Sequence, residues 1–355
     1  MTTLPTPARS LAARRGGAST IAALVMAVAA FGAVACASTA TTTGAVAPPG
    51  TSSSSAAPGP SAAPPAPVGS TAPTQPGSGA PYETAHTTIT LVDTTRATEA
   101  GAQSPAHPER TLETTVWTPT DSAPHPLIVF SHGLSGHPDK FAKLLAAWTR
   151  VGFVVAAPAF PLTNDRVPGN PQNWTGLAQQ PNDVRFVIDE MLRLGDDPAS
   201  PVYHRIIKDQ IGAGGLSLGG ATTYGVVFND CCRDPRIKSA EVLSGAQLPV
   251  GGGENHIDGH VPLLIMHGDK DASLPYSYEV KTFADSPAPV WFVTLAGGTH
   301  APPFEDDPSP WDDLDEKVTT DFWLGTLGAG GGDPAALARM EAEAVVPGLS
   351  SLQKK

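Results

Sequence analysis

Cysteine and basic residues are scarce in this sequence. Its 355 residues include 3 cysteines, and 22 lysines and arginines stand against 34 aspartates and glutamates, which gives a formal net charge of −12. A chain this acidic is a poor partner for nucleic acid or for anionic lipid headgroups. Cys231 and Cys232 are adjacent, which fits no zinc-ligand spacing and leaves open either two thiols or a vicinal disulfide.

Motifs for cofactors are also lacking. No phosphate-binding loop of the form G-x-x-x-x-G-K-[ST] occurs, and the glycines at 212 and 214 do not complete a dinucleotide-binding pattern. His256 and His260 flank Asp258, but no further cluster completes a metal shell, which favours a solvated loop. The sequence therefore predicts no nucleotide cofactor and no metal.

One apolar run near the start is too short and too rich in alanine for a comfortable membrane span. It extends from Ile21 to Val34 and follows three arginines, as is typical of a secretory signal. It ends in Ala33-Val34-Ala35-Cys36, which looks like a bacterial lipoprotein cleavage box with alanine in place of the usual leucine. Residues 1–35 are predicted to be a lipoprotein-type signal peptide, and lipidated Cys36 would anchor the protein outside the cytoplasm, at the bacterial cell membrane. Ordinary signal cleavage nearby, followed by secretion, is the alternative.

The next segment is compositionally simple. Residues 36–81 are dominated by Ala, Ser, Thr, Pro and Gly, without a charged or aromatic residue. Such a segment cannot bury enough apolar surface to offset its ordering entropy, so we expect a disordered tether. Proline-rich linkers extend by up to ~3 Å per residue, so this one could reach on the order of 100 Å from a membrane.

Residues 82–328 carry the patterns of one large α/β domain, and residues 329–355 are interpreted as a C-terminal extension. The alternating segments 87–92 and 112–117 are typical of outer, antiparallel strands. Continuous apolar runs separated by helical spacings predict strands buried on both faces, as at 127–131, 153–157, 211–214, 240–243, 263–266 and 290–294. We therefore expect a mostly parallel central sheet with helices on both faces, whose active site lies beyond the carboxyl ends of the strands.

The most informative motif is Gly215-Leu216-Ser217-Leu218-Gly219, which lies between a predicted strand and a predicted helix. A serine between glycines on such a turn is exposed above the sheet, as a nucleophile requires. Two further strands are followed by residues that could complete a catalytic triad. Asp269 and Asp271 are candidate acids, and His300 on a glycine-rich loop is a candidate general base.

An acyl-transfer site also needs two backbone N–H groups for the oxyanion of the tetrahedral intermediate. Leu218, directly after the serine, would supply one of them. The turn that begins at His132-Gly133 follows a buried strand, and Leu134 would supply the other. His132 and His267 are interpreted as structural loop residues.

Together these motifs resemble the α/β-hydrolase superfamily over essentially all of residues 82–328. The chain looks most like the secreted serine esterases related to dienelactone hydrolases, platelet-activating-factor acetylhydrolases and cutinase-like polyester hydrolases. The resemblance implies a triad of Ser217, Asp271 and His300, because hydrolases of this type carry the acid three residues after His-Gly and before a Leu/Val-Pro pair. Two departures limit it: Leu216 stands where many lipases and polyesterases have histidine or tryptophan, and dienelactone hydrolases use a cysteine nucleophile.

These features predict a serine carboxylester hydrolase that acts through an acyl-enzyme, without a cofactor. Only about 18 residues separate Ser244 from the strand near Leu263, too few for a helical cap domain. An open site without a cap suits bulky, lipid-like or polymer-like esters. Thioester or amide hydrolysis and acyl transfer by the same triad are alternatives, as is a catalytically silent hydrolase-fold lipoprotein with a binding role.

Overall fold

The computed structural model describes residues 80–101, 103–168, 174–250, 253–328 and 332–355. The predicted signal peptide, Cys36 and the tether as far as residue 79 lie outside the described residues, so the structure does not bear on them. Within the part that is described, no helix is long and apolar enough to cross a bilayer.

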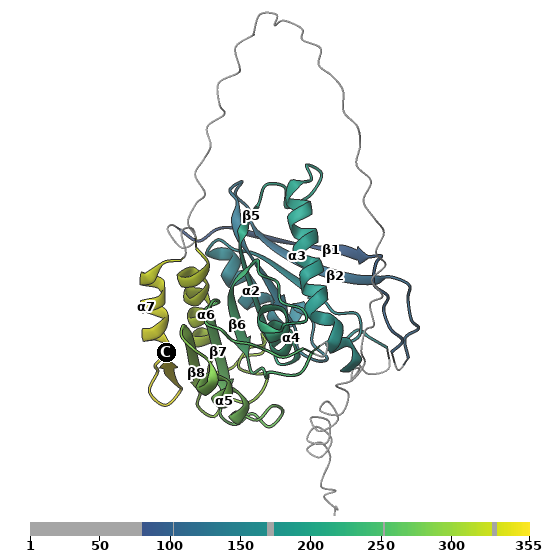
Figure 1. Ribbon diagram of the computed structural model, residues 1–355. Helices are drawn as coiled ribbons and strands as arrows, with labels where there is room; N and C mark the ends of the chain where they lie inside the picture. Colours follow the sequence, from purple (N-terminus) through teal and green to yellow (C-terminus); the bar gives the residue numbers. More distant parts are fainter. Residues whose placement is uncertain (1–79, 102, 169–173, 251–252, 329–331) are drawn as a thin grey trace, which may run out of the picture.

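A nine-stranded sheet forms the centre of the molecule, in the order β1-β2-β4-β3-β5-β6-β7-β8-β9 (Figure 1). Its strands are β1 (Thr84–Asp93), β2 (Arg110–Pro119), β3 (His125–Ser131), β4 (Val154–Ala159), β5 (Ile206–Leu216), β6 (Ile237–Leu243), β7 (Leu263–Gly268), β8 (Val290–Leu295) and β9 (Ser350–Lys354). From β4 to β8 neighbouring strands are parallel, whereas β1, β2 and β9 pair antiparallel. The predicted mostly parallel sheet with antiparallel outer strands is confirmed.

Strand β3 is buried on both faces, which explains the continuous apolar run at 127–130. Leu127 and Val129 pack into one buried cluster, whereas Ile128 and Phe130 pack into another on the opposite face. All four side chains have no exposed surface. Because successive side chains of a strand point to opposite faces, both faces must be covered, and an alternating pattern would leave a polar side chain in one core.

Helices cover both faces of the sheet. They are α2 (Ala142–Arg150), α3 (Gln180–Asp196), α4 (Leu218–Phe228), α5 (Ser277–Asp285), α6 (Asp312–Leu327) and α7 (Pro334–Glu343), with short 3₁₀ turns η1 (Pro138–Phe141) and η2 (Trp174–Gln179). Helices α3 and α4 contribute to the cluster that contains Leu127, and α2, α6 and α7 to the cluster that contains Ile128. The predicted layers of helix, sheet and helix are thus present.

The C-terminal segment is part of this domain, although the sequence analysis separated residues 329–355 as an extension. Ala336, Met340 and Ala344 are buried in the same cluster as α6. Strand β9 adds to the sheet by pairing with β8. Residues 332–355 therefore pack as part of the same domain and not as a separate extension after residue 328. The sequence pattern missed β9 because it is a polar edge strand in which only Ser350 is buried.

The connection from β6 to β7 lies against the end of α4. Its described residues, 244–250 and 253–262, contain no helix. Asn229 Nδ2 donates to Asn255 Oδ1 at 2.9 Å, and the His256 N–H donates to the Phe228 carbonyl at 2.8 Å. Cys231 and Cys232 form a vicinal disulfide at the same point, which decides between the two states left open by the sequence.

Candidate active site

Ser217 lies in a sharp turn between the end of β5 and the start of α4. Its φ is 58°, in the left-handed region that residues with side chains rarely adopt. A Cβ atom on Gly219 would lie 1.9 Å from the carbonyl oxygen of Ser131, and one on Gly215 would lie 2.6 Å from it. Only glycine fits at either position, because the turn brings α4 directly against the end of β3.

The structure brings Ser217, His300 and Asp271 together in that order. His300 Nε2 lies 2.7 Å from Ser217 Oγ, and His300 Nδ1 lies 2.6 Å from Asp271 Oδ2. The three residues follow β5, β8 and β7, whose carboxyl ends share one edge of the sheet. The His300 side chain is 19% exposed, whereas that of Asp271 is fully buried. A hydroxyl, an imidazole and a carboxylate are thus placed for proton transfer from the serine.

Asp271 is surrounded by hydrogen-bond donors. Its Oδ1 accepts from the N–H groups of Ser273 at 2.7 Å and Leu274 at 2.9 Å. Burial opposes ionisation, but hydrogen bonds from His267, His300 and the Leu274 N–H outweigh it and hold the pKa of Asp271 below its ordinary value. The carboxylate therefore stays negative at neutral pH, where it can orient His300 and stabilise its charged form.

Asp269, the other candidate acid, has a different place. Its Oδ1 accepts from the Gly297 N–H at 2.9 Å, and the neighbouring Lys270 N–H donates to the Gly298 carbonyl at 2.9 Å. These bonds hold the loop that carries His300 against the loop that carries Asp271. Asp269 therefore braces the site rather than joining the chain from Ser217.

The loop after β3 lies directly beside the nucleophile. A Cβ atom on Gly133 would be 3.2 Å from Ser217 Cβ. Within the described residues the Leu134 N–H has no acceptor, whereas the next N–H, of Ser135, donates to the Thr163 carbonyl at 2.8 Å. Leu218 is the first residue of α4, so its N–H has no acceptor inside the helix. Both N–H groups assigned from the sequence are thus available to an oxyanion.

His132 holds this loop in place. Its Nδ1 donates to the Gly133 carbonyl at 2.7 Å, and its Nε2 accepts from the Phe160 N–H at 3.1 Å. Burial lowers the pKa of His132 to about 4, so the ring is neutral at physiological pH, as these two bonds require. The structural role expected for His132 agrees with these contacts.

His267 contributes more than the sequence suggested. It was interpreted as a loop residue, but its Nε2 lies 3.1 Å from Asp271 Oδ2, the oxygen that also contacts His300. Its side chain is fully buried, and Glu279 from α5 lies close enough to interact with it electrostatically. No motif in the sequence indicated either interaction, and the one with Glu279 depends on how α5 packs against β7.

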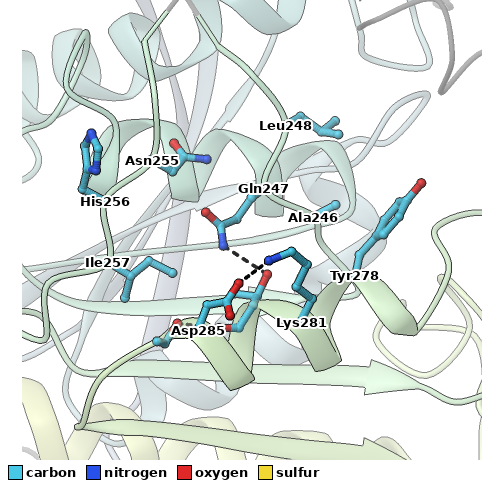
Figure 2. Close-up of a pocket in the computed structure, with 11 residues that line it drawn as sticks. Ala246, Gln247, Leu248, Asn255, His256, Ile257, Tyr278, Lys281 and Asp285 are labelled. Carbon is cyan, nitrogen blue, oxygen red and sulfur yellow. Dashed lines mark hydrogen bonds and ion pairs between the residues drawn. The ribbon is translucent and has the colours of Figure 1, made fainter.

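Apolar side chains line one side of the site. Leu134 and Leu248 pack partly buried against a small cluster that includes Leu218. Leu248 also borders a cleft of about 650 Å³ between the β6–β7 connection and α5. In Figure 2, Leu248 and Tyr278 lie together on one side of this cleft, and His256 lies on the opposite side. Leu248 therefore connects the cleft to the cluster that contains Leu218, the residue after Ser217.

Comparison with protein-family models and with curated proteins gives no match. Among the residues described here, no group of three or more His, Cys, Asp or Glu side chains is placed to hold a metal ion. The side chains of His256 and His260 are both mostly exposed. Any assignment of function therefore rests on the geometry of the site.

Proposed function

We propose that the protein is a serine hydrolase that cleaves carboxylic esters, built on the α/β-hydrolase fold. The order of the strands supports this fold, with an antiparallel β2 beside a parallel sheet. So does the position of the three residues, since a nucleophile after β5, an acid after β7 and a histidine after β8 follow the order of that superfamily. The observation that carries the proposal is the unbroken chain of 2.7 Å and 2.6 Å contacts from Ser217 through His300 to Asp271.

The reaction proceeds in two halves. Ser217 Oγ attacks the ester carbonyl while His300 Nε2 accepts its proton, and the N–H groups of Leu134 and Leu218 bind the resulting oxyanion. His300 then donates this proton to the leaving alcohol, which leaves the acyl group on Ser217. Water attacks the acyl-enzyme in the second half, with His300 again as the base. Asp271 remains ionised throughout and stabilises the charged imidazole.

The surroundings of the site support bulky esters as substrates. The described residues between β6 and β7 form no helical cover, and the His300 side chain is partly exposed. Leu134 and Leu248 are partly exposed apolar side chains that pack against the cluster containing Leu218, and the cleft bordered by Leu248 provides room for a longer substituent. Apolar walls with a few polar groups are typical of sites that bind such ligands.

Replacing Ser217 with alanine tests the proposal. With a chromogenic short-chain ester, Ser217→Ala should lower kcat by at least about 10³-fold, because it removes the nucleophile, while the thermal unfolding midpoint stays close to that of the wild type. A serine-directed phosphonate should label the wild type and leave this variant unlabelled.

The matched control is Ser244→Ala. Ser244 lies after β6 at the same edge of the sheet and, among the described residues, its buried hydroxyl has no hydrogen-bond partner. This variant should keep its activity and its labelling. Turnover by Ser217→Ala at the wild-type rate would rule out the proposed mechanism.

A further inference from the structure

Asp271 is contacted by two histidines, and the second has no part in the reaction described above. His267 Nε2 lies 3.1 Å from Asp271 Oδ2 and 3.1 Å from the carbonyl oxygen of Leu274. Both neighbours are acceptors at neutral pH, so Nε2 must carry a hydrogen and donate to them. The lone pairs of Asp271 Oδ2 are thus shared between His267 and His300.

A carboxyl group lies behind His267. Glu279 on α5 is fully buried, and its Oε2 accepts a hydrogen bond from the Tyr224 hydroxyl at 2.7 Å. Within the described residues, neither Glu279 Oε1 nor His267 Nδ1 has a hydrogen-bond partner. Each of these two buried polar atoms therefore lacks a hydrogen bond within that part of the chain, which is costly for a polar group.

The chemistry of this place is poised near neutral pH. Burial raises the pKa of Glu279 to about 7. The hydrogen bond from Tyr224, the electrostatic interaction with His267 and the hydrogen bond with Thr282 act in the opposite direction and only partly offset the effect of burial. Tyr276 packs the edge of its ring against His267, with ring centroids 5.9 Å apart. The titratable groups around His267 and Glu279 are thus Tyr224 and Tyr276, together with Asp271 and, through it, His300.

We propose that His267 and Glu279 form a buried pair of positioning residues, which fix the orientation of Asp271 and set how strongly it supports His300. This inference rests on the proposed function. When Glu279 ionises, negative charge appears behind His267 and strengthens the donor that His267 offers to Asp271 Oδ2. The same charge favours the protonated form of the triad, so it sets the pH at which His300 becomes free to act as a base.

The test compares two buried glutamates in the full-length protein. Glu279→Gln removes the ionisable group but keeps an acceptor for Tyr224, and Glu241→Gln makes the same substitution on β6, at a fully buried glutamate that, among the described residues, has no contact to the triad. The measurement is kcat/KM for a chromogenic ester as a function of pH, with thermal unfolding as a check on folding. Glu279→Gln should move the acid limb of this profile to lower pH by on the order of one unit. Glu241→Gln should leave the limb in place.

A second pair of variants tests the donor itself. His267→Phe removes the hydrogen bond to Asp271 and should lower kcat/KM roughly 10- to 100-fold, the worth of one charge-assisted hydrogen bond. His267→Gln restores an N–H donor and should recover part of this loss. Equal activity of both variants and the wild type would overturn the proposal.

The outcomes separate this inference from the proposed function. Coincident pH profiles for Glu279→Gln and the wild type, with Ser217→Ala inactive, would reject the pair and leave the esterase assignment in place. If Glu279→Gln does not fold, ¹⁵N NMR of the histidines in the wild type decides. We expect His267 to be protonated at Nε2 and its Nδ1 signal to change as pH passes through 7. A ring protonated at Nδ1 alone would contradict the proposal.

Discussion

Asp271 in the candidate site and two acids in the core, Glu241 and Asp315, are all buried but have opposite properties. Asp271 lies at the carboxyl edge of the sheet, and hydrogen bonds hold its pKa below its ordinary value even though burial opposes this. Glu241 on β6 and Asp315 on α6 lie in the core between sheet and helix, where burial raises both pKa values well above the ordinary ones. Within the described residues, both carboxylate oxygens of Glu241 and Oδ1 of Asp315 have no hydrogen-bond partner. Between Asp271 and this second group, the difference in pKa follows the hydrogen-bond donors that surround Asp271.

The largest expected effect separates the two groups by activity. Asp271→Asn should lower kcat by about 10⁴-fold, because an amide no longer fixes the tautomer of His300 or stabilises its charge. Asp315→Asn, the same substitution in the other group, should leave kcat unchanged, because no contact joins Asp315 to the triad. Steady-state kinetics with one ester substrate measure both. A large loss of activity in Asp315→Asn would show that the two groups are coupled.

Stability as a function of pH sharpens the comparison. The folded state keeps Glu241 protonated. The contribution of this protonated group to the free energy of unfolding is therefore complete at a pH below the pKa of Glu241 in the unfolded chain. It is lost as the pH rises towards the higher pKa of Glu241 in the folded protein. Glu241→Gln should therefore be more stable than the wild type at pH 9 by on the order of 1–3 kcal/mol, and similar to it at pH 4. Denaturant unfolding at both pH values measures the difference.

Asp271 should behave in the opposite sense. The pKa of Asp271 is lower in the folded protein than in the unfolded chain. The ionised carboxylate therefore contributes to the free energy of unfolding at a pH above the pKa of the unfolded chain, and this contribution is lost as the pH falls through the pKa of the folded protein. The deficit of Asp271→Asn relative to the wild type should accordingly shrink in acid. A deficit that instead grows as pH falls would contradict the assignment of Asp271 as a charged group.

The smallest expected effect concerns an exposed ion pair, in which burial does not oppose ionisation of the acid. Lys208 Nζ lies 2.7 Å from Asp196 Oδ2, and both side chains are more than half exposed. Water screens this pair, so Lys208→Ala should change the free energy of unfolding by less than about 0.5 kcal/mol, measured by denaturant unfolding. A larger change would mean that exposed charges contribute as much as the buried ones.

The sheet could be predicted because its strands are long continuous apolar runs. Segments such as 127–131 and 263–266 fit no other role in an α/β domain. Helix α5 and the segment after residue 328 were missed for a common reason. Only Glu279 and Thr282 are buried on α5, and only Ala336 and Met340 on α7, too few to form a recognisable apolar stripe.

The candidate site divides in the same way. Ser217 is recognisable in the sequence because the glycines that its turn requires lie within the same five consecutive residues. The residues around Asp271 distinguish it from Asp269 in the same local way. The electrostatic interaction between His267 and Glu279 has no such local pattern in the sequence. A histidine and a glutamate twelve residues apart carry no pattern, and only the packing of α5 against β7 brings them together.

The turn at Ser217 has a consequence for directed evolution. Gly215 and Gly219 meet the backbone of Ser131 at distances that exclude any side chain, so random mutagenesis there should yield unfolded clones. Leu134 and Leu248 are only partly buried against the cluster that contains Leu218, so changes of side-chain shape at these two positions should be tolerated. Libraries aimed at a new substrate range would therefore be smaller and contain more folded variants if they sampled these two leucines and left the glycines unchanged.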